Sequence, residues 1–195
     1  MGIPVLCLLA GVVAGRLGSG FDAETLDLVI NSCLCLVVFC AGMDVGAKRS
    51  ALYGLRSRGI KVLLVPLGVV LGSLLGGALL GAVLHIPANE STAVAAGFGY
   101  YSLSSGLLAS FGGAALGSLA FLSNIFRELL ALLLIPLVAR LHPYCAVAIG
   151  GATSMDTTLG MVARHTDEET TVISLLSGIV LSILVPILVP LLYQI

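Results

Sequence analysis

Two stretches decide how this sequence folds: GFGYYSLSSG at residues 97–106 and GGATSMDTTLG at residues 150–160. Each places glycines and hydroxyl side chains inside a chain that is otherwise strongly apolar. A helix broken within a membrane needs hydroxyls, water or neighbouring helices to satisfy its freed backbone groups, whereas an uninterrupted span does not. The stretches therefore predict two broken or re-entrant segments, with an ordinary span that packs through small residues as the alternative.

The composition of the rest of the chain is that of a membrane protein. Of 195 residues, 58% are hydrophobic and only 10% are charged, whereas an ordinary soluble domain has about 25% charged residues. So few charges cannot cover a globular surface, which argues against a soluble enzyme, a disordered chain or a nucleic-acid-binding protein. The formal net charge of −1 implies no electrostatic partner.

Five apolar runs are candidates for membrane-spanning helices, because about 20 residues cross the hydrocarbon core. They are residues 3–17, 28–45, 60–84, 116–138 and 171–193. The broken or re-entrant Gly/Ser-rich segments are residues 91–113 and 144–164. We therefore expect an all-α membrane protein with about five transmembrane helices and two such segments, forming one multi-span transporter domain over residues 1–195.

Basic residues predict the orientation of the chain. The loop between the second and third runs has no acidic residue but carries Lys48, Arg49, Arg56, Arg58 and Lys61. The positive-inside rule places this loop in the cytoplasm, so the N-terminus is expected to be cytoplasmic and the C-terminus periplasmic. Re-entry of both broken segments is favoured, because Arg140 and Arg164 then both lie inside.

The two stretches also resemble each other. Residues 97–103 can be laid beside residues 150–156, and in the re-entrant arrangement one stretch enters from each side of the membrane. Such a pair is typical of an inverted repeat with a binding site near the membrane midplane. Chance is the alternative explanation for so short a likeness.

Four charged residues lie within or at the edge of the apolar runs: Asp44, Arg127, Glu128 and Asp156. A charge at the bilayer centre costs roughly 2.5–3.5 kcal/mol on insertion scales, so such residues usually pair, face water or carry function. Asp156 is the most informative because hydroxyl side chains surround it, and we expect it to bind a cation or a proton. The structural alternative is that Asp156 caps a half-helix beginning at Thr157.

Arg127 and Glu128 are adjacent, so on a helix their side chains point roughly 100° apart and each needs its own partner. Asn124 lies one turn before Glu128 and can share its face. The functional interpretation places Glu128 in the same aqueous pocket as Asp156, while Arg127 neutralises a carboxylate or binds that of the substrate. The structural interpretation is an ion pair between helices. Asp44 is interpreted as an interfacial residue.

Hydroxyl side chains complete the candidate site. The hydroxyl groups of Ser102, Ser104 and Ser105 would lie near the N-terminus of a half-helix. There they could bind a substrate carboxylate or satisfy freed backbone groups. Two more precede Asp156 on the other segment. The predicted substrate- or proton-binding residues are Asp156, Glu128, Arg127, Asn124, Ser102, Ser104, Ser105, Thr153 and Ser154. We expect no catalytic residue, no metal and no cofactor.

Three motifs together resemble the bacterial LysO-type lysine exporter family. They are AGFGYYSLS at residues 96–104, Arg127-Glu128-Leu129 within a span, and GATSMD at residues 151–156. The resemblance covers nearly the whole chain. It implies export of L-lysine across the bacterial inner membrane in exchange for protons, with Asp156 at the family's intramembrane acidic position.

One departure from the family concerns length. Long members carry an additional N-terminal membrane region, so the chain resembles the C-terminal portion of a split exporter. The expected partners are L-lysine, protons, the lipid bilayer, and either a small membrane protein that supplies the N-terminal region or further copies of this chain. No nucleic acid is expected.

The sequence is also compatible with other functions. A sodium/proton antiporter or an organic-anion carrier would have a similar architecture, and a non-transporting membrane subunit of a split transporter is a further alternative. An intramembrane serine protease is disfavoured, because serine catalysis needs a base, usually His, and no His lies in a predicted span.

Overall fold

The computed structural model describes residues 61–194 and, before them, the single helical residues 13, 28, 29, 32, 36, 39 and 43. The predicted spans at residues 3–17 and 28–45 otherwise lie outside the described residues. By its contacts the chain divides into residues 1–35 and 36–195, and the helices below all belong to the second unit. They are α4 (Lys61–Leu84), α5 (Ala88–Ala95), α6 (Tyr101–Val138), α7 (Pro143–Gly150), the 3₁₀-helix η1 (Gly151–Met155), α8 (Leu159–His165) and α9 (Glu168–Gln194).

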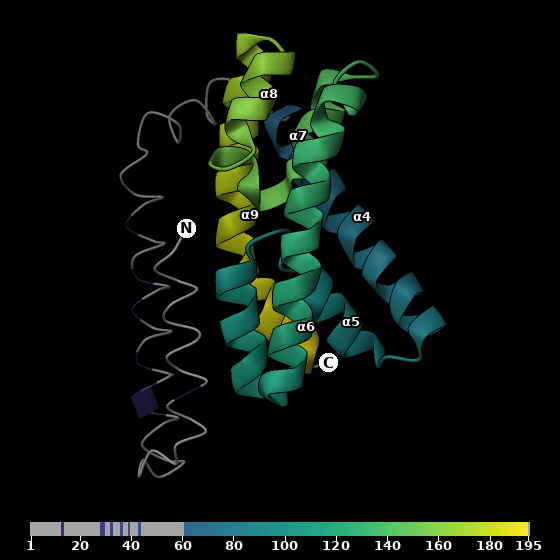
Figure 1. Ribbon diagram of the computed structural model, residues 1–195, viewed down its shortest axis with the longest axis vertical. Helices are drawn as coiled ribbons and strands as arrows, with labels where there is room; N and C mark the ends of the chain where they lie inside the picture. The colour runs from purple at the N-terminus through teal and green to yellow at the C-terminus, as the bar shows by residue number, and fades with distance from the viewer. Residues whose placement is uncertain are drawn as a thin grey trace. The chain divides into compact units, whose positions relative to one another are not determined.

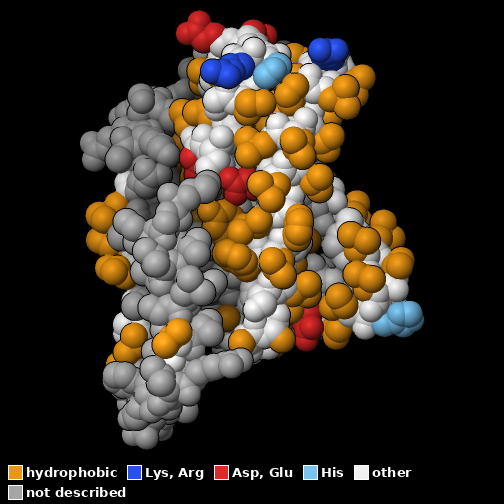
Figure 2. All heavy atoms as spheres, in the orientation of Figure 1, with side chains coloured by type: hydrophobic (Ala, Val, Ile, Leu, Met, Phe, Trp, Pro, Cys, Tyr) orange, Lys and Arg blue, Asp and Glu red, His pale blue; other side chains and the backbone are white. Residues whose placement is uncertain are grey.

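Three of these helices, α4, α6 and α9, are long and apolar enough to cross a membrane. They contain the predicted spans at residues 60–84, 116–138 and 171–193, except that α4 begins at Lys61. Residues 61–194 contain no strand, so the expected all-α membrane class is confirmed. Figure 2 shows hydrophobic side chains over most of the visible described surface, with Lys or Arg side chains only at its upper end.

Helix α6 consists of two arms, residues 101–112 and 114–138, that meet at Gly113. The backbone of Gly113 is not helical (φ 82°, ψ 175°), a conformation that glycine adopts without steric cost. A straight helix would separate residues 109 and 117 by about 12 Å, yet a Cβ added to Gly117 would lie 2.5 Å from the Cβ of Ala109. The two arms therefore fold back on each other (Figure 1).

Helix α5 and the first arm of α6 form one helical hairpin, whose tip is residues 96–100. Both ends of this hairpin are held by Tyr193, near the C-terminal end of α9. The backbone carbonyl of Tyr193 accepts a hydrogen bond of 3.1 Å from the Asn89 side chain, and its hydroxyl donates one of 3.2 Å to the Phe111 carbonyl. The chain thus enters and leaves this hairpin at the same end of α9.

Helices α7 and α8, with η1 between them, form a second hairpin at the other end of α9. Helix α8 ends at His165, shortly before α9 begins at Glu168. The tip η1 packs against the middle of α9, where a Cβ added to Gly178 would lie 2.6 Å from the backbone nitrogen of Met155. The two predicted segments are therefore broken helices, and they form hairpins that run in from opposite ends of α9 (Figure 1).

An apolar core holds the second hairpin in place. Its buried side chains come from the second arm of α6, from α7, α8 and α9, and from the start of α4. They are Val65, Ala131, Ile135, Ala146, Val147, Val162, Ile173, Leu176 and Ile179. Of the predicted site residues, Thr153 and Ser154 lie in the tip η1 and Asp156 directly follows it, whereas those at 124, 127 and 128 lie on the second arm of α6.

Candidate functional site

The tips of the two hairpins touch each other. The backbone N–H of Ala152 donates a hydrogen bond of 2.9 Å to the carbonyl of Phe98. Phe98 and Gly151, which are equivalent when residues 97–103 are laid beside residues 150–156, both have left-handed backbone angles (φ 49° and 64°). The two stretches that the sequence singled out thus meet beside the middle of α9, each with a positive φ at the matching position.

Asn124, on the second arm of α6, holds the first tip. Its Oδ1 accepts a hydrogen bond of 2.7 Å from the N–H of Gly99. Its Nδ2 lies 2.9 Å from the Ala120 carbonyl, 3.3 Å from the Val94 carbonyl and 3.4 Å from Ser104 Oγ. Asn124 is buried and satisfies backbone groups that the break in the helix frees. The side chain of Asn124 therefore forms its hydrogen bonds with the first hairpin and with its own helix, not with Glu128.

Ser104 is also used within the first tip. Its hydroxyl is fully buried and donates a hydrogen bond of 2.9 Å to the Tyr100 carbonyl. Ser102 is exposed in the first turn of α6, and Ser105 donates to the Ser102 carbonyl at 3.3 Å. Ser104 therefore has the structural role that the sequence left open, while Ser102 and Ser105 lie nearer the surface at the N-terminus of the first arm.

Hydroxyl groups fix the second tip as well. Thr153 donates a hydrogen bond of 2.8 Å to the Gly150 carbonyl. The hydroxyl of Ser154 donates to the carbonyl of Ser174 in α9, and the hydroxyl of Ser174 donates back to the carbonyl of Ser154, each at 2.9 Å. Thr153, Ser154 and Ser174 are all buried. These hydroxyls anchor η1 to the middle of α9.

Asp156 follows η1 directly and is exposed. Its Oδ1 accepts a hydrogen bond of 2.6 Å from the N–H of Thr157 and lies 3.4 Å from the Thr157 hydroxyl. The predicted alternative, in which Asp156 caps a half-helix beginning at Thr157, is wrong. Helix α8 begins at Leu159 with Thr158 at the N-cap position, because residues 156–158 form a turn after η1. In residues 61–194 no basic side chain pairs with Asp156.

Arg127 lies where the two tips meet. Its Nη1 donates a hydrogen bond of 3.0 Å to Ser73 Oγ of α4. A Cβ added to Gly151 would lie 2.8 Å from Arg127 Nη2 and 2.5 Å from the Phe98 carbonyl oxygen, so the guanidinium packs against Gly151 at the point where the second tip meets the first. Neither Arg127 nor the half-buried Glu128 forms an ion pair with another described residue. Among these residues, the helix-to-helix ion pair is therefore not observed.

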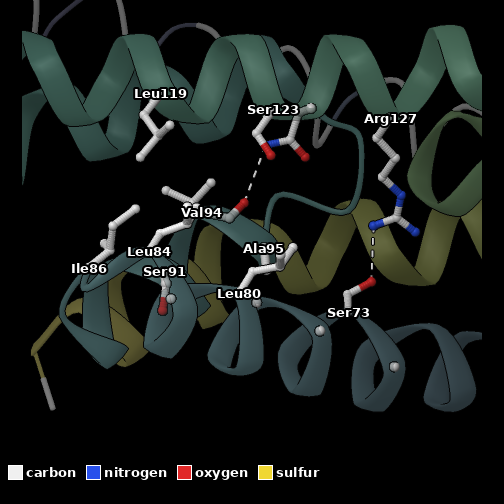
Figure 3. A pocket seen from close by; sticks show the side chains of 15 residues that line it. Ser73, Leu80, Leu84, Ile86, Ser91, Val94, Ala95, Leu119, Ser123 and Arg127 are labelled. Atoms are coloured by element: carbon white, nitrogen blue, oxygen red, sulfur yellow. Dashed lines mark hydrogen bonds between the residues drawn. The ribbon is translucent and has the colours of Figure 1, made fainter.

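A cavity of about 320 Å³ extends from Arg127 between α4, α5 and the second arm of α6 (Figure 3). It is lined by Gly72, Ser73, Gly76, Gly77, Leu80, Gly81, Leu84, Ile86, Ser91, Val94, Ala95, Leu119, Ser123, Asn124 and Arg127. Neither Glu128 nor Asp156 lines it. The structure thus brings Arg127 and Asn124 into one cavity but does not place the two acids there.

The model of the lysine exporter LysO family matches residues 5–193. The chain belongs to this family. It is 39% identical over 158 residues to "Lysine exporter LysO" of Escherichia coli (strain K12), which covers 80% of this chain and 52% of that protein. It is 38% identical over 143 residues to "Putative lysine exporter" of Haemophilus influenzae, which covers 69% of this chain and 73% of that protein.

The chain thus spans about half the length of its Escherichia coli relative. No solved structure matches it significantly. The family is one of transporters, and together with the three long apolar helices it points to a multi-pass protein of the inner membrane.

Two sets of polar residues near the site were not predicted from the sequence. One is Ser73, the partner of Arg127 on α4. The other is the buried polar side of α9, formed by Thr170, Ser174, Ser177 and Ser182. A signal for the second set was present, because these residues recur three to five positions apart in an otherwise apolar run and so share roughly one face of a helix.

Proposed function

We propose that this chain exports L-lysine from the cytoplasm in exchange for protons, as one multi-span transporter domain rather than as an enzyme. One observation carries the proposal: in a chain of the lysine exporter family, two oppositely directed hairpins meet through the bond between Ala152 and Phe98. Broken segments that meet in the middle of a bundle are the usual place for a carrier's binding site, because their freed backbone groups and helix ends face the substrate.

Asp156 is the proposed binding group for an ammonium of lysine. It is exposed at the end of η1, its carboxylate has no basic partner in residues 61–194, and Ser and Thr hydroxyls surround the same tip. A carboxylate that binds an ammonium in one state and a proton in the other couples the two fluxes. Glu128, half-buried one position after Arg127, is the proposed second acid.

The proposed orientation follows from the basic loop before α4. We place the N-terminus in the cytoplasm and the turn between α4 and α5 outside, so the C-terminus is also outside. The hairpin of α5 and α6 then enters from the periplasmic side, and that of α7 and α8 from the cytoplasm. A small membrane partner or further copies of this chain complete the proposed assembly.

Everted membrane vesicles test the transport proposal. Vesicles from cells that express the chain, in a host without other lysine exporters, should take up labelled lysine and release protons from an acidified lumen. Asp156→Asn should abolish both signals while the amount of protein in the membrane stays unchanged. Glu169→Gln is the matched control, because Glu169 is an exposed acid in the first turn of α9.

The same vesicle assay also distinguishes lysine export from the alternative transport functions. Proton movement that follows Na⁺ or an organic anion, with no lysine uptake, would indicate a different cargo. Full lysine uptake and proton release by Asp156→Asn would remove this carboxylate from the mechanism.

A further inference from the structure

The hydrogen bond between Arg127 and Ser73 joins the middles of two long helices. Ser73 is near the centre of α4, and Arg127 is near the centre of the second arm of α6. The side chain of Arg127 is half-buried there. Figure 3 shows it reaching from α6 toward α4 at one end of the cavity, with Leu84 and Ile86 at the other end.

Among residues 61–194, no carboxylate pairs with the guanidinium of Arg127. A guanidinium has five N–H donors, yet the described residues supply Arg127 with a single hydrogen-bond acceptor, Ser73 Oγ. No Asp or Glu occurs among the residues that line the cavity. Most of the N–H donors of this half-buried guanidinium are therefore left without an acceptor among the described residues, so this end of the cavity has the chemistry to bind a carboxylate from a ligand.

The rest of the cavity fits an aliphatic chain. Its α4 wall is formed largely by glycines and leucines, and its α5 and α6 walls carry Val94, Ala95 and Leu119. From Ser73 to Leu84 the cavity follows α4 for roughly 16 Å. With the carboxylate of a ligand on Arg127, which is itself a cation, a side-chain ammonium would point away from Arg127, toward the end formed by the turn between α4 and α5.

We propose that this cavity is the carboxylate subsite of the exit pathway, and that Arg127 selects substrates that carry a carboxylate over diamines of the same length. The inference rests on the proposed function and deepens it. Arg127 binds the carboxylate of lysine in a fork of two N–H groups, the methylene chain lies along the glycine wall of α4, and the side-chain ammonium leads toward the outside.

Selectivity for the carboxylate is the direct test. In everted vesicles, the uptake of labelled lysine is compared with that of labelled 1,5-diaminopentane, which is lysine without its carboxylate. We expect the unmodified chain to favour lysine by about tenfold to a hundredfold, the usual strength of a hydrogen bond to a charged group. Arg127→Gln should bring this ratio close to one, because it lowers lysine uptake and spares the diamine.

Two further variants sharpen the selectivity test. Arg127→Lys keeps the charge but not the fork of donors, so it should keep part of the preference. Arg140→Gln is the matched control, since Arg140 is exposed at the end of α6 and does not line the cavity. Lysine uptake by Arg127→Gln with an unchanged ratio would overturn the proposal and assign Arg127 a structural role.

A second pair of variants covers the case in which Arg127→Gln fails to fold. Gly76 lines the cavity and Gly68 does not, and a Cβ at either position would meet nothing within 4 Å. Gly76→Leu should fill the cavity and abolish lysine uptake, whereas Gly68→Leu should retain it. Uptake that survives Gly76→Leu, or is lost in both variants, would overturn the proposed subsite. Absence of lysine uptake by the unmodified chain would instead remove the proposed function itself.

Discussion

The carbonyl of Phe98 accepts a hydrogen bond of 2.9 Å from the backbone N–H of Ala152, and this bond joins the tips of two hairpins that come from opposite ends of α9. Each tip is also fixed to a long helix. Asn124 holds the first tip to the second arm of α6, and the reciprocal bonds between Ser154 and Ser174 hold the second tip to α9. The bond between Phe98 and Ala152 therefore joins two hairpin tips, each of which is held in place by a different long helix.

Asn124→Ala should destabilise the protein by about 2–6 kcal/mol. The substitution removes the acceptor of the Gly99 N–H and the donor to the Val94 carbonyl, and each buried group left without a partner costs about 1–3 kcal/mol. Thermal unfolding in detergent, followed by the loss of monodisperse protein, measures the effect. Ser118→Ala, on the exposed face of the same arm, is the control. Equal melting temperatures for the two variants would show that Asn124 does not support the tip.

The broken segments could be predicted from the sequence because their signal is local. Glycines beside hydroxyl residues in an apolar run show that a helix cannot continue there and that its backbone groups have partners nearby. The boundary predicted at residue 113 coincides with the turn between the two arms of α6. The apolar runs that became α4 and α9 were similarly evident from length alone.

The partners of the charged and polar residues could not be predicted in the same way. Helical periodicity shows that Asn124 and Glu128 are one turn apart, but it does not show what faces them. Asn124 lies against a tip more than 20 residues earlier in the chain, and Arg127 reaches Ser73 across 54 residues. Such pairings depend on how the hairpins pack, which no short sequence pattern records.

Because η1 packs closely on α9, we expect alanine substitutions at Gly178 and Gly160 to affect the stability of the protein differently. A Cβ at Gly178 would lie 2.6 Å from the backbone nitrogen of Met155 and 2.8 Å from the Ala152 carbonyl, so Gly178→Ala should destabilise the protein by about 1–3 kcal/mol. Gly160 in α8 has no atom within 4 Å of an added Cβ. Gly160→Ala should be neutral or stabilising by up to about 1 kcal/mol, because alanine is the better helix former.

Thermal unfolding of the two glycine variants, side by side, checks this prediction. Lysine uptake by Gly178→Ala should fall together with its stability, since η1 carries Asp156 at its end. A Gly178→Ala variant as stable as Gly160→Ala would mean that η1 does not pack against α9 as closely as the structure has it.

Asp167 predicts a pH dependence of stability that is separate from transport. Its Oδ1 accepts a hydrogen bond of 2.7 Å from the N–H of Thr170 at the start of α9, and this bond lowers the pKa of Asp167 below its usual value. Because the folded-state pKa is the lower one, the carboxylate stabilises α9 above the unfolded pKa of about 4, and this contribution is lost as the pH falls through the folded-state pKa. The melting temperature of Asp167→Ala should therefore be below that of the unmodified chain at pH 7, and the gap between the two should narrow as the pH falls below about 4. Glu168→Ala is the control, because Glu168 is the exposed acid next to Asp167 and makes no such bond to a described residue. A gap between Asp167→Ala and the unmodified chain that stays constant down to pH 3 would show that the charge of Asp167 is not what stabilises the helix.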